Sequence, residues 1–409
     1  MLKKMARLRL CAAMIFAASP ATAALAEGQS VSLNEALVRA GTESPAVQVS
    51  QAEIDIARGN QKQASLGPNP EVSVDVENVA GSGVFKGLRS TEYTVSVGQR
   101  LELGGKRGAR TRAARAQTSL AEIEAAISQA ELASSVRLAY TEAVAAQSRV
   151  GFATRVVGRN RELARIARIL VETGRDPPLR ALRADAALGE AQAALEAARA
   201  EEYSARLLLA SLWGSQTPPQ KVEPVWLSGG DVEFEADLSQ SLQIKAVEAN
   251  RDAASAIVTR ERANAVPDLT LSGGARRFEE SGDTAFIVGA SIAIPFGNRN
   301  QGGIQAAEAS VRGAEARRAL RLVEINREYN IASNQLEATQ SRVETLESQT
   351  LPQAEEASRL AQLGYQYGKF TLLDVLDAAA ARDTAELGLL EAKVARAEAV
   401  ITLLRLAAK

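Results

Sequence analysis

The side chains that most often carry out chemistry are scarce in this chain. Its 409 residues include no histidine and one cysteine, Cys11. A Ser-His-Asp triad, a Cys-His dyad and a histidine-ligated metal centre are therefore excluded. The 48 Lys and Arg residues nearly balance the 49 Asp and Glu residues, which argues against nucleic acid as a partner because phosphate binding needs a basic face. We expect no cofactor, no metal site and no enzyme activity.

Two aspartates, Asp374 and Asp377, form the acid pair whose spacing best suits a function. Because they are three positions apart in a predicted helix, both carboxylates lie on one helix face. Carboxylates gathered on one face can attract cations and repel anions. Helix capping is an alternative explanation, because Thr371 with an acid three residues later forms a capping box at a helix start. The two roles are compatible.

An internal duplication, with a period near 195 residues, organises the chain. The segment Pro-Glu-Val-Ser-Val at residues 70–74 recurs as Pro-Asp-Leu-Thr-Leu at residues 267–271. A period this long indicates two copies of a domain-sized unit rather than a solenoid. We assign the first repeat to residues 27–217 and the second to residues 218–409.

Each repeat is predicted to contain a helix, two strands, a very long helix, a tight turn and another long helix. The strands show period-two alternation, as in Val72, Val74 and Val76 among polar neighbours. Between residues 106 and 171 only scattered glycines interrupt the helical pattern, which predicts a rod of roughly 100 Å. We expect strands at about residues 70–79, 91–103, 268–278 and 284–296, and helices at about residues 33–65, 106–171, 178–213, 238–264, 303–363 and 371–406.

The last predicted helix carries a heptad pattern typical of coiled-coil packing. Its core positions run from Leu373 to Leu404 in alternating steps of three and four, and Asp383 is the one polar residue among them. Pro352 is expected to kink the long helix of the second repeat. The predicted fold class is mainly α, with long antiparallel coiled-coil helices and a smaller β portion.

Four strands with one apolar face pose a physical problem. They cannot close into a barrel alone, and an open sheet edge is costly in lipid and prone to aggregation in water. Three chains that pool four strands each would close a twelve-stranded barrel, an even number within the usual outer-membrane range. The strands are also long enough to cross a bilayer at a tilt. A soluble sheet with one wet face is the alternative.

Residues 1–26 have the features of a secretory signal peptide. Four basic residues precede a short apolar run, and small residues at 21–23 or 24–26 offer a cleavage site. Cys11 would be removed with this segment. No later run is long and apolar enough for a transmembrane helix. We therefore expect an exported protein.

Four motifs, in a fixed order along the chain, carry a resemblance to a known family. They are LNEAL at 33–37 followed by Ser44-Pro45, PNPEV at 68–72, QRLELGGKR at 99–107 and YQYGKFTLLDVLDA at 365–378. With these motifs the chain resembles the TolC-like outer-membrane efflux proteins, most of all the branch that serves heavy-metal exporters of the cobalt–zinc–cadmium and copper–silver type. The resemblance covers essentially the whole chain after the signal peptide.

The resemblance implies a homotrimer, with a twelve-stranded transmembrane β-barrel in the outer membrane and a tunnel of twelve helices across the periplasm. It implies a passive channel in a tripartite efflux system. Such a channel would receive substrate, heavy-metal cations in this branch, from a periplasmic membrane-fusion adaptor and an inner-membrane pump of the resistance–nodulation–division class. Outer-membrane lipid is the remaining partner, and neither nucleic acid nor a cofactor is implied.

The resemblance also places functional residues at the periplasmic end of the tunnel. Asp374 and Asp377 fall where the family has an acidic entrance constriction. Arg180 and Arg183 lie 194 residues earlier at the equivalent positions, which suggests a latch between neighbouring hairpins. Two solvated arginines are the alternative, since an exposed pair is worth only about 0–1 kcal/mol. The hairpin tips that would contact the adaptor comprise Gly174, Leu179, Gly368, Lys369, Thr371 and Leu372.

Other functions stay open at this point. Drug or solvent efflux and type I protein secretion would use the same kind of channel. A soluble periplasmic coiled-coil adaptor would share the export signal and the heptads, although it would not place paired strands in two copies. An enzyme with paired carboxylates, such as a glycosidase, would need a pocket that no segment of the sequence offers.

Overall fold

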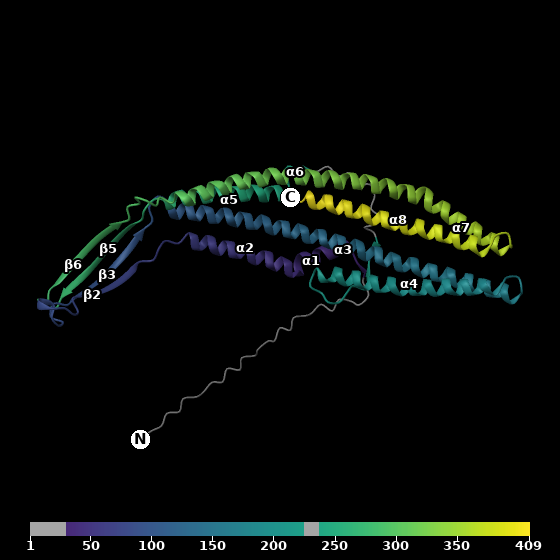
Figure 1. The fold of residues 1–409 in the computed structure, drawn as a ribbon, viewed down its shortest axis with the longest axis horizontal. Coiled ribbons are helices and arrows are strands. Elements are labelled where there is room, and N and C mark those ends of the chain that lie inside the picture. Colours follow the sequence, from purple (N-terminus) through teal and green to yellow (C-terminus); the bar gives the residue numbers. More distant parts are fainter. Residues whose placement is uncertain (1–29, 225–236) are drawn as a thin grey trace, which may run out of the picture.

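The computed structural model describes residues 30–224 and 237–409, which form a long, narrow molecule (Figure 1). A sheet forms one end, and long helices extend from it to two hairpin tips at the other end. The predicted signal peptide, with Cys11, lies outside the described residues. The elements are β1 (Ser30–Val31), α1 (Leu33–Glu43), α2 (Pro45–Ala64), β2 (Glu71–Glu77), β3 (Glu92–Leu101), α3 (Lys106–Glu172), α4 (Pro178–Ser211), β4 (Lys221–Val222), α5 (Leu242–Asn264), β5 (Leu269–Phe278), β6 (Thr284–Ile292), α6 (Gln301–Thr345), a π-helical turn (Leu346–Thr350), α7 (Leu351–Gln366) and α8 (Leu372–Leu406), with 3₁₀ turns at Gly83–Phe85 and Leu238–Gln240.

The four longer strands form one antiparallel sheet in the order β2-β3-β5-β6. The hairpin of the first half joins that of the second through β3 and β5, whose register runs from Glu92 opposite Phe278 to Leu101 opposite Leu269. Among the described residues, β2 and β6 each pair on one side only. The sheet therefore ends in two open edges.

Period-two alternation gives the sheet two different faces. Val74 lies opposite Val95 on one face, and Phe286 of β6, on the same face, is 89% exposed. The other face is polar, with Arg276 of β5 paired to Glu77 of β2 at 2.8 Å. The four strands that the alternation predicts are thus confirmed, and their apolar side chains lie on an exposed surface.

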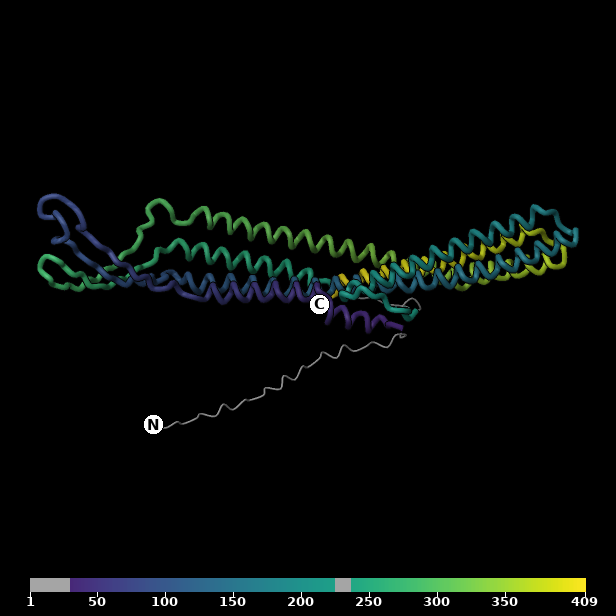
Figure 2. The backbone as a smooth tube through the Cα atoms, turned by 90° about the horizontal axis from the view of Figure 1, so that it is seen from below, coloured from purple at the N-terminus to yellow at the C-terminus, as the bar shows by residue number. Residues whose placement is uncertain are grey.

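Small side chains dominate the packing of the helices. α3 runs for 67 residues without a break and packs against α2 and α5 toward the sheet and against α4 and α8 toward the tips (Figures 1 and 2). Its buried face includes Ala143, Ala145 and Ala167, each 0% exposed. Alanine lets helix axes approach closely, which suits long antiparallel helices of the predicted kind. Within residues 30–224 and 237–409, no helix combines the length and the apolar character needed to cross a membrane.

Two of the predicted helices are interrupted in the structure. The predicted 33–65 helix is two helices, because Ser44 is extended ahead of Pro45 and its hydroxyl accepts from the amide of Ala46. The predicted 303–363 helix contains the π-helical turn Leu346–Thr350, directly before Pro352. Proline has no amide to donate and its ring crowds the preceding turn, so the helix widens there.

Smaller differences concern the ends of elements. β6 ends at Ile292 rather than near residue 296, because Pro295 cannot donate to a ladder. α5 begins at Leu242 rather than 238, where the Ser241 hydroxyl caps it by accepting from the amide of Ile244. The division between repeats at residues 217 and 218 stays a prediction.

The start of the described chain is held at the waist of the molecule, near the middle of its length (Figure 1). β1 pairs in parallel with β4, and Tyr140 of α3 lies against both. The Tyr140 hydroxyl is 3.0 Å from the carbonyl oxygen of Val31 and 2.8 Å from that of Glu223, and it accepts from the Glu223 amide at 3.1 Å. Burial raises the pKa of Tyr140 to about 12.

Candidate functional site

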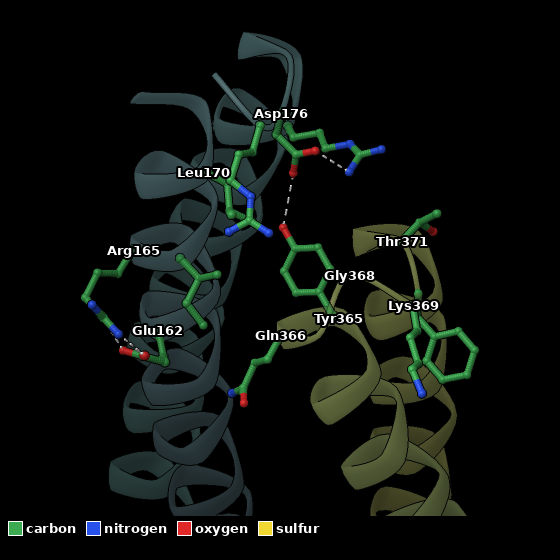
Figure 3. A pocket seen from close by; sticks show the side chains of 13 residues that line it. Glu162, Arg165, Leu170, Asp176, Tyr365, Gln366, Gly368, Lys369 and Thr371 are labelled. Carbon is green, nitrogen blue, oxygen red and sulfur yellow. Dashed lines mark hydrogen bonds and ion pairs between the residues drawn. The ribbon is translucent and has the colours of Figure 1, made fainter. Parts of the chain in front are cut away.

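The predicted site residues gather at the end of the molecule farthest from the sheet (Figure 1). Two hairpins end there, α3–α4 with its turn at residues 173–177 and α7–α8 with its turn at residues 367–371. A cavity of about 630 Å³ lies between them and is lined by side chains of both hairpins (Figure 3).

Both turns have the same backbone. Gly174 and Gly368 adopt left-handed φ angles of 70° and 72°. Arg175 and Lys369, the residues that follow, donate their amides to the carbonyl oxygens five positions earlier, at 2.8 and 2.7 Å. A left-handed glycine that closes the last helical turn is typical of helix C-termini. The two glycines are therefore required by turn geometry, whatever else they do.

α8 begins with a complete capping box. The Thr371 hydroxyl accepts from the amide of Asp374 at 3.3 Å, and the Asp374 carboxylate accepts from the Thr371 amide at 2.7 Å. Hydrogen bonds from the Thr371 hydroxyl and then from its amide lower the pKa of Asp374. Asp374 and Asp377 are both exposed. The capping role considered for Asp374 is thus present.

The start of α4 differs from that of α8. α4 follows Pro177 and has no side-chain cap. Arg180 pairs with Asp176 of its own turn at 2.6 Å, and Arg183 is exposed. Arg180 is thus engaged within its own hairpin, so a latch to Asp374 stays a proposal about contacts between chains.

Tyr365 and Asp176 connect the two hairpins, and the sequence prediction missed them. The Tyr365 hydroxyl donates to Oδ2 of Asp176 at 3.4 Å (Figure 3). Tyr365 is buried, and this burial, followed by the nearby Asp176 carboxylate, raises the pKa of Tyr365 above 10.0. Both residues lie within turn motifs visible in the sequence, but nothing in the spacing of residues so distant in the chain shows that they meet.

One predicted contact residue is not available at the surface. Leu372 is 4% exposed and packs in an apolar cluster with Leu163 of α3 and Tyr365 of α7. As the first residue of α8 it faces the neighbouring helices, which excludes it as an adaptor contact in this arrangement. The other predicted contacts are exposed, namely Gly174, Leu179, Gly368, Lys369 and Thr371.

Cationic side chains outnumber acidic ones around the tip cavity. Glu162 and Asp176 are its two carboxylates, each paired with an arginine, Glu162 with Arg165 at 2.5 Å. The cations that line it are Arg165, Arg175, Arg180 and Lys369. In the part of the chain that the structure describes, no group of three or more acidic or thiol side chains is placed to hold a metal ion.

Comparison with known proteins relates the whole described chain to one kind of protein. Residues 36–215 and 235–409 match the family model described as "Outer membrane efflux protein". The chain is 31% identical over 338 residues to the cobalt-zinc-cadmium resistance protein CzcC of Cupriavidus metallidurans, a match that covers 80% of this chain and 78% of that protein. It is 30% identical to the nickel-cobalt-cadmium resistance protein NccC of Alcaligenes xylosoxydans xylosoxydans, over 80% of this chain and 74% of that protein. The crystal structure of CusC aligns with a TM-score of 0.78 at 19% identity and covers 92% of both chains, which confirms the predicted fold.

Proposed function

This chain belongs to the outer membrane efflux protein family and is an outer-membrane channel component of an efflux system, and we propose that three copies form the channel and that its cargo is heavy-metal cations. The relatives support the cargo, because both are named as resistance proteins for cobalt, cadmium and related metals. One observation carries the proposal, a four-stranded sheet with two open edges, one apolar exposed face and one polar face. The proposed role is conduction without catalysis.

The open edges are the physical reason for three copies. In lipid, every backbone amide and carbonyl needs a partner, so β2 and β6 must each pair with another strand. Three chains of four strands would close twelve strands with β6 of one copy against β2 of the next. Phe286 and its neighbours would then face lipid, while Arg276 and Glu77 would line the water-filled interior.

An efflux channel of this family works with an adaptor and a pump, and we assign the adaptor contact to the two hairpin tips. The exposed Leu179 and Lys369 stand on either side of the cavity between the hairpins. The excess of cations around that cavity favours an adaptor tip with acidic side chains. We further propose a pump of the resistance–nodulation–division class.

At the entrance, Asp374 and Asp377 would form two acidic rings under threefold symmetry, and Arg180 and Arg183 of neighbouring hairpins would hold them closed. The variant Asp374→Ala with Asp377→Ala tests this in planar bilayers. Single-channel conductance should rise and cation selectivity should fall. Thr371→Ala is the matched control, because it removes the α8 cap but keeps both carboxylates. Unchanged conductance and selectivity in the double variant would contradict the constriction.

The cargo is tested by deleting the gene and measuring tolerance to cobalt, zinc, cadmium and nickel salts. Loss of tolerance, restored by the wild-type chain, supports metal efflux. Normal metal tolerance with new sensitivity to dyes, drugs or solvents would replace the cargo and keep the channel. The number of copies is tested separately by native mass spectrometry in detergent, where three chains are expected and a monomer would contradict the assembly.

A further inference from the structure

The interface between α3 and α8 changes character along its length. Near the waist, Ala143 of α3 and Ala397 of α8 belong to one apolar cluster. Near the tip, Leu163 of α3 and Val375 of α8 belong to another. The stretch between these clusters, residues 152–160 of α3 and 382–387 of α8, is held by ions instead. The two hairpins are thus joined by apolar contact at two levels and by charge at the level between them.

Two ion pairs make this middle contact, Arg155 with Glu386 and Arg159 with Asp383. Asp383 is the single polar residue in the heptad core of α8, and its side chain is only 21% exposed, with Arg159 at 13%. Burial raises the pKa of Asp383, while the neighbouring Arg159 opposes that rise. An ionic contact therefore replaces what would otherwise be one more layer of apolar coiled-coil packing.

The ionic contact holds unused hydrogen-bonding capacity. Oδ1 of Asp383 and Nε of Arg159 and of Arg382 are buried and have no hydrogen-bond partner among the described residues. Arg382 lies 3.8 Å from Glu355 of α7 and 3.9 Å from Glu386, which is a loose contact with each. A network in this state can exchange partners without leaving a charge unpaired, whereas a fully bonded network resists change.

Two further irregularities lie at the same level. A cavity of about 230 Å³, lined by Phe152, Arg155, Glu386 and Leu389 among others, separates α3 from α8 directly beside the ion pairs. Leu346, the first residue of the π-helical turn, packs in the apolar cluster that contains Leu389. π-helical turns interrupt regular helical bonding and are frequent at functional sites in helices. Loose packing between the hairpins and a break within one of them therefore coincide.

We propose that this level is a hinge at which the α7–α8 hairpin swings relative to α3, and that Arg155 and Arg159 position the hairpin by holding Glu386 and Asp383 as it moves. Long guanidinium side chains keep a contact while the helices shift, whereas interlocked apolar side chains would separate. The swing changes the distance between the two tips. The inference rests on the proposed channel only where it takes this distance to set the periplasmic opening.

The test measures the distance between the tips directly. Cysteines that replace Glu172 and Tyr367, both exposed and one in each hairpin, carry spin labels in full-length protein with Cys11→Ser, diluted with unlabelled chains. Asp383→Ala should shift the distance distribution to longer values and broaden it, and the milder Asp383→Asn should do the same to a smaller extent. Exchanging the charges, with Arg159→Asp and Asp383→Arg, should restore the wild-type distribution.

A matched control breaks an ion pair that does not cross the interface. Arg168 of α3 pairs with Asp185 of α4 at 2.6 Å within one hairpin, so Asp185→Ala should leave the distance unchanged. Wild-type distances in both Asp383 variants would overturn the hinge, as would equal broadening by Asp185→Ala. Single-channel conductance is recorded in parallel and should rise several-fold with Asp383→Ala. A longer distance with unchanged conductance would keep the hinge and contradict the proposed channel entrance.

Discussion

At the tip of α3–α4, Leu170 and Asp176 occupy the positions that Gly364 and Phe370 occupy at the tip of α7–α8. The backbone bonds of the two turns are the same, yet the side chains fill them differently. A Cβ on Gly364 would lie 2.2 Å from the ring of Phe370, so this ring rests on the glycine. In the other tip, the Asp176 carboxylate instead reaches Arg180 and the opposite hairpin. One tip is closed by an apolar contact and the other by an ionic one.

The comparison separates what the turn requires from what it leaves free. Both turns need their left-handed glycine. Neither needs a particular charge in the helix that follows, because α4 starts with Arg180 where α8 starts with Asp374. The opposite charges at equivalent positions are therefore not imposed by the fold, and this makes them available for gating.

The largest effect is expected from giving the second tip a residue of the first. Gly364→Leu forces the Phe370 ring away from the turn, and overpacking of this kind costs about 1–3 kcal/mol. Hydrogen exchange of peptides covering residues 360–375 should accelerate. Adding Phe370→Asp recreates the pair found in the first tip and should restore slow exchange. If the double variant exchanges as fast as the single one, the two tips are not interchangeable.

The next effect tests whether the turns are equally strained. Gly174→Ala and Gly368→Ala should each destabilise their own tip by about 1–2 kcal/mol, because a left-handed conformation is unfavourable for alanine. The two costs should match, since no heavy atom lies within 4 Å of an added Cβ at either position. Local hydrogen exchange measures both. A clear inequality would show that packing, as well as backbone conformation, restrains one of the turns.

A smaller effect isolates the cap that only α8 has. Thr371→Ala removes the hydroxyl that bonds the Asp374 amide and should cost about 1 kcal/mol at the start of α8. Pro177→Ala, at the equivalent position of α4, removes no side-chain cap and should have little effect. Exchange rates at the two helix starts give the comparison. Equal losses in both variants would show that the cap contributes nothing measurable.

The smallest effect is a dependence on acid. Because folding lowers the pKa of Asp374, its capping contribution is complete above the ordinary value of 3.8 and is lost as the pH falls through the lower folded value. A fluorophore on a cysteine replacing Tyr367 should therefore report fraying of α8 only in this acid range. Asp374→Asn should abolish the transition, and a transition that persists would assign it to another group.

Periodicity and turn chemistry were sufficient to predict the long helices, the four strands and the two tips. The absence of breakers between residues 106 and 171 predicted α3, and the glycines predicted the turns. Contacts between distant segments were out of reach. Asp383 was visible as an exception in a heptad, but its partner Arg159 lies 224 residues away, and no spacing encodes that pairing. The split at Ser44 was missed because proline is also tolerated in the first turn of a helix.

The waist contact made by Tyr140 has a practical consequence. Since β1 is bound beside β4, the polypeptide ahead of Ser30 leaves the fold from the side of the molecule, between the sheet and the tips. A fluorescent dye or a surface tether introduced there would hold the molecule by its flank. Both ends would then stay accessible, which makes this position a suitable handle for immobilised single-molecule recording.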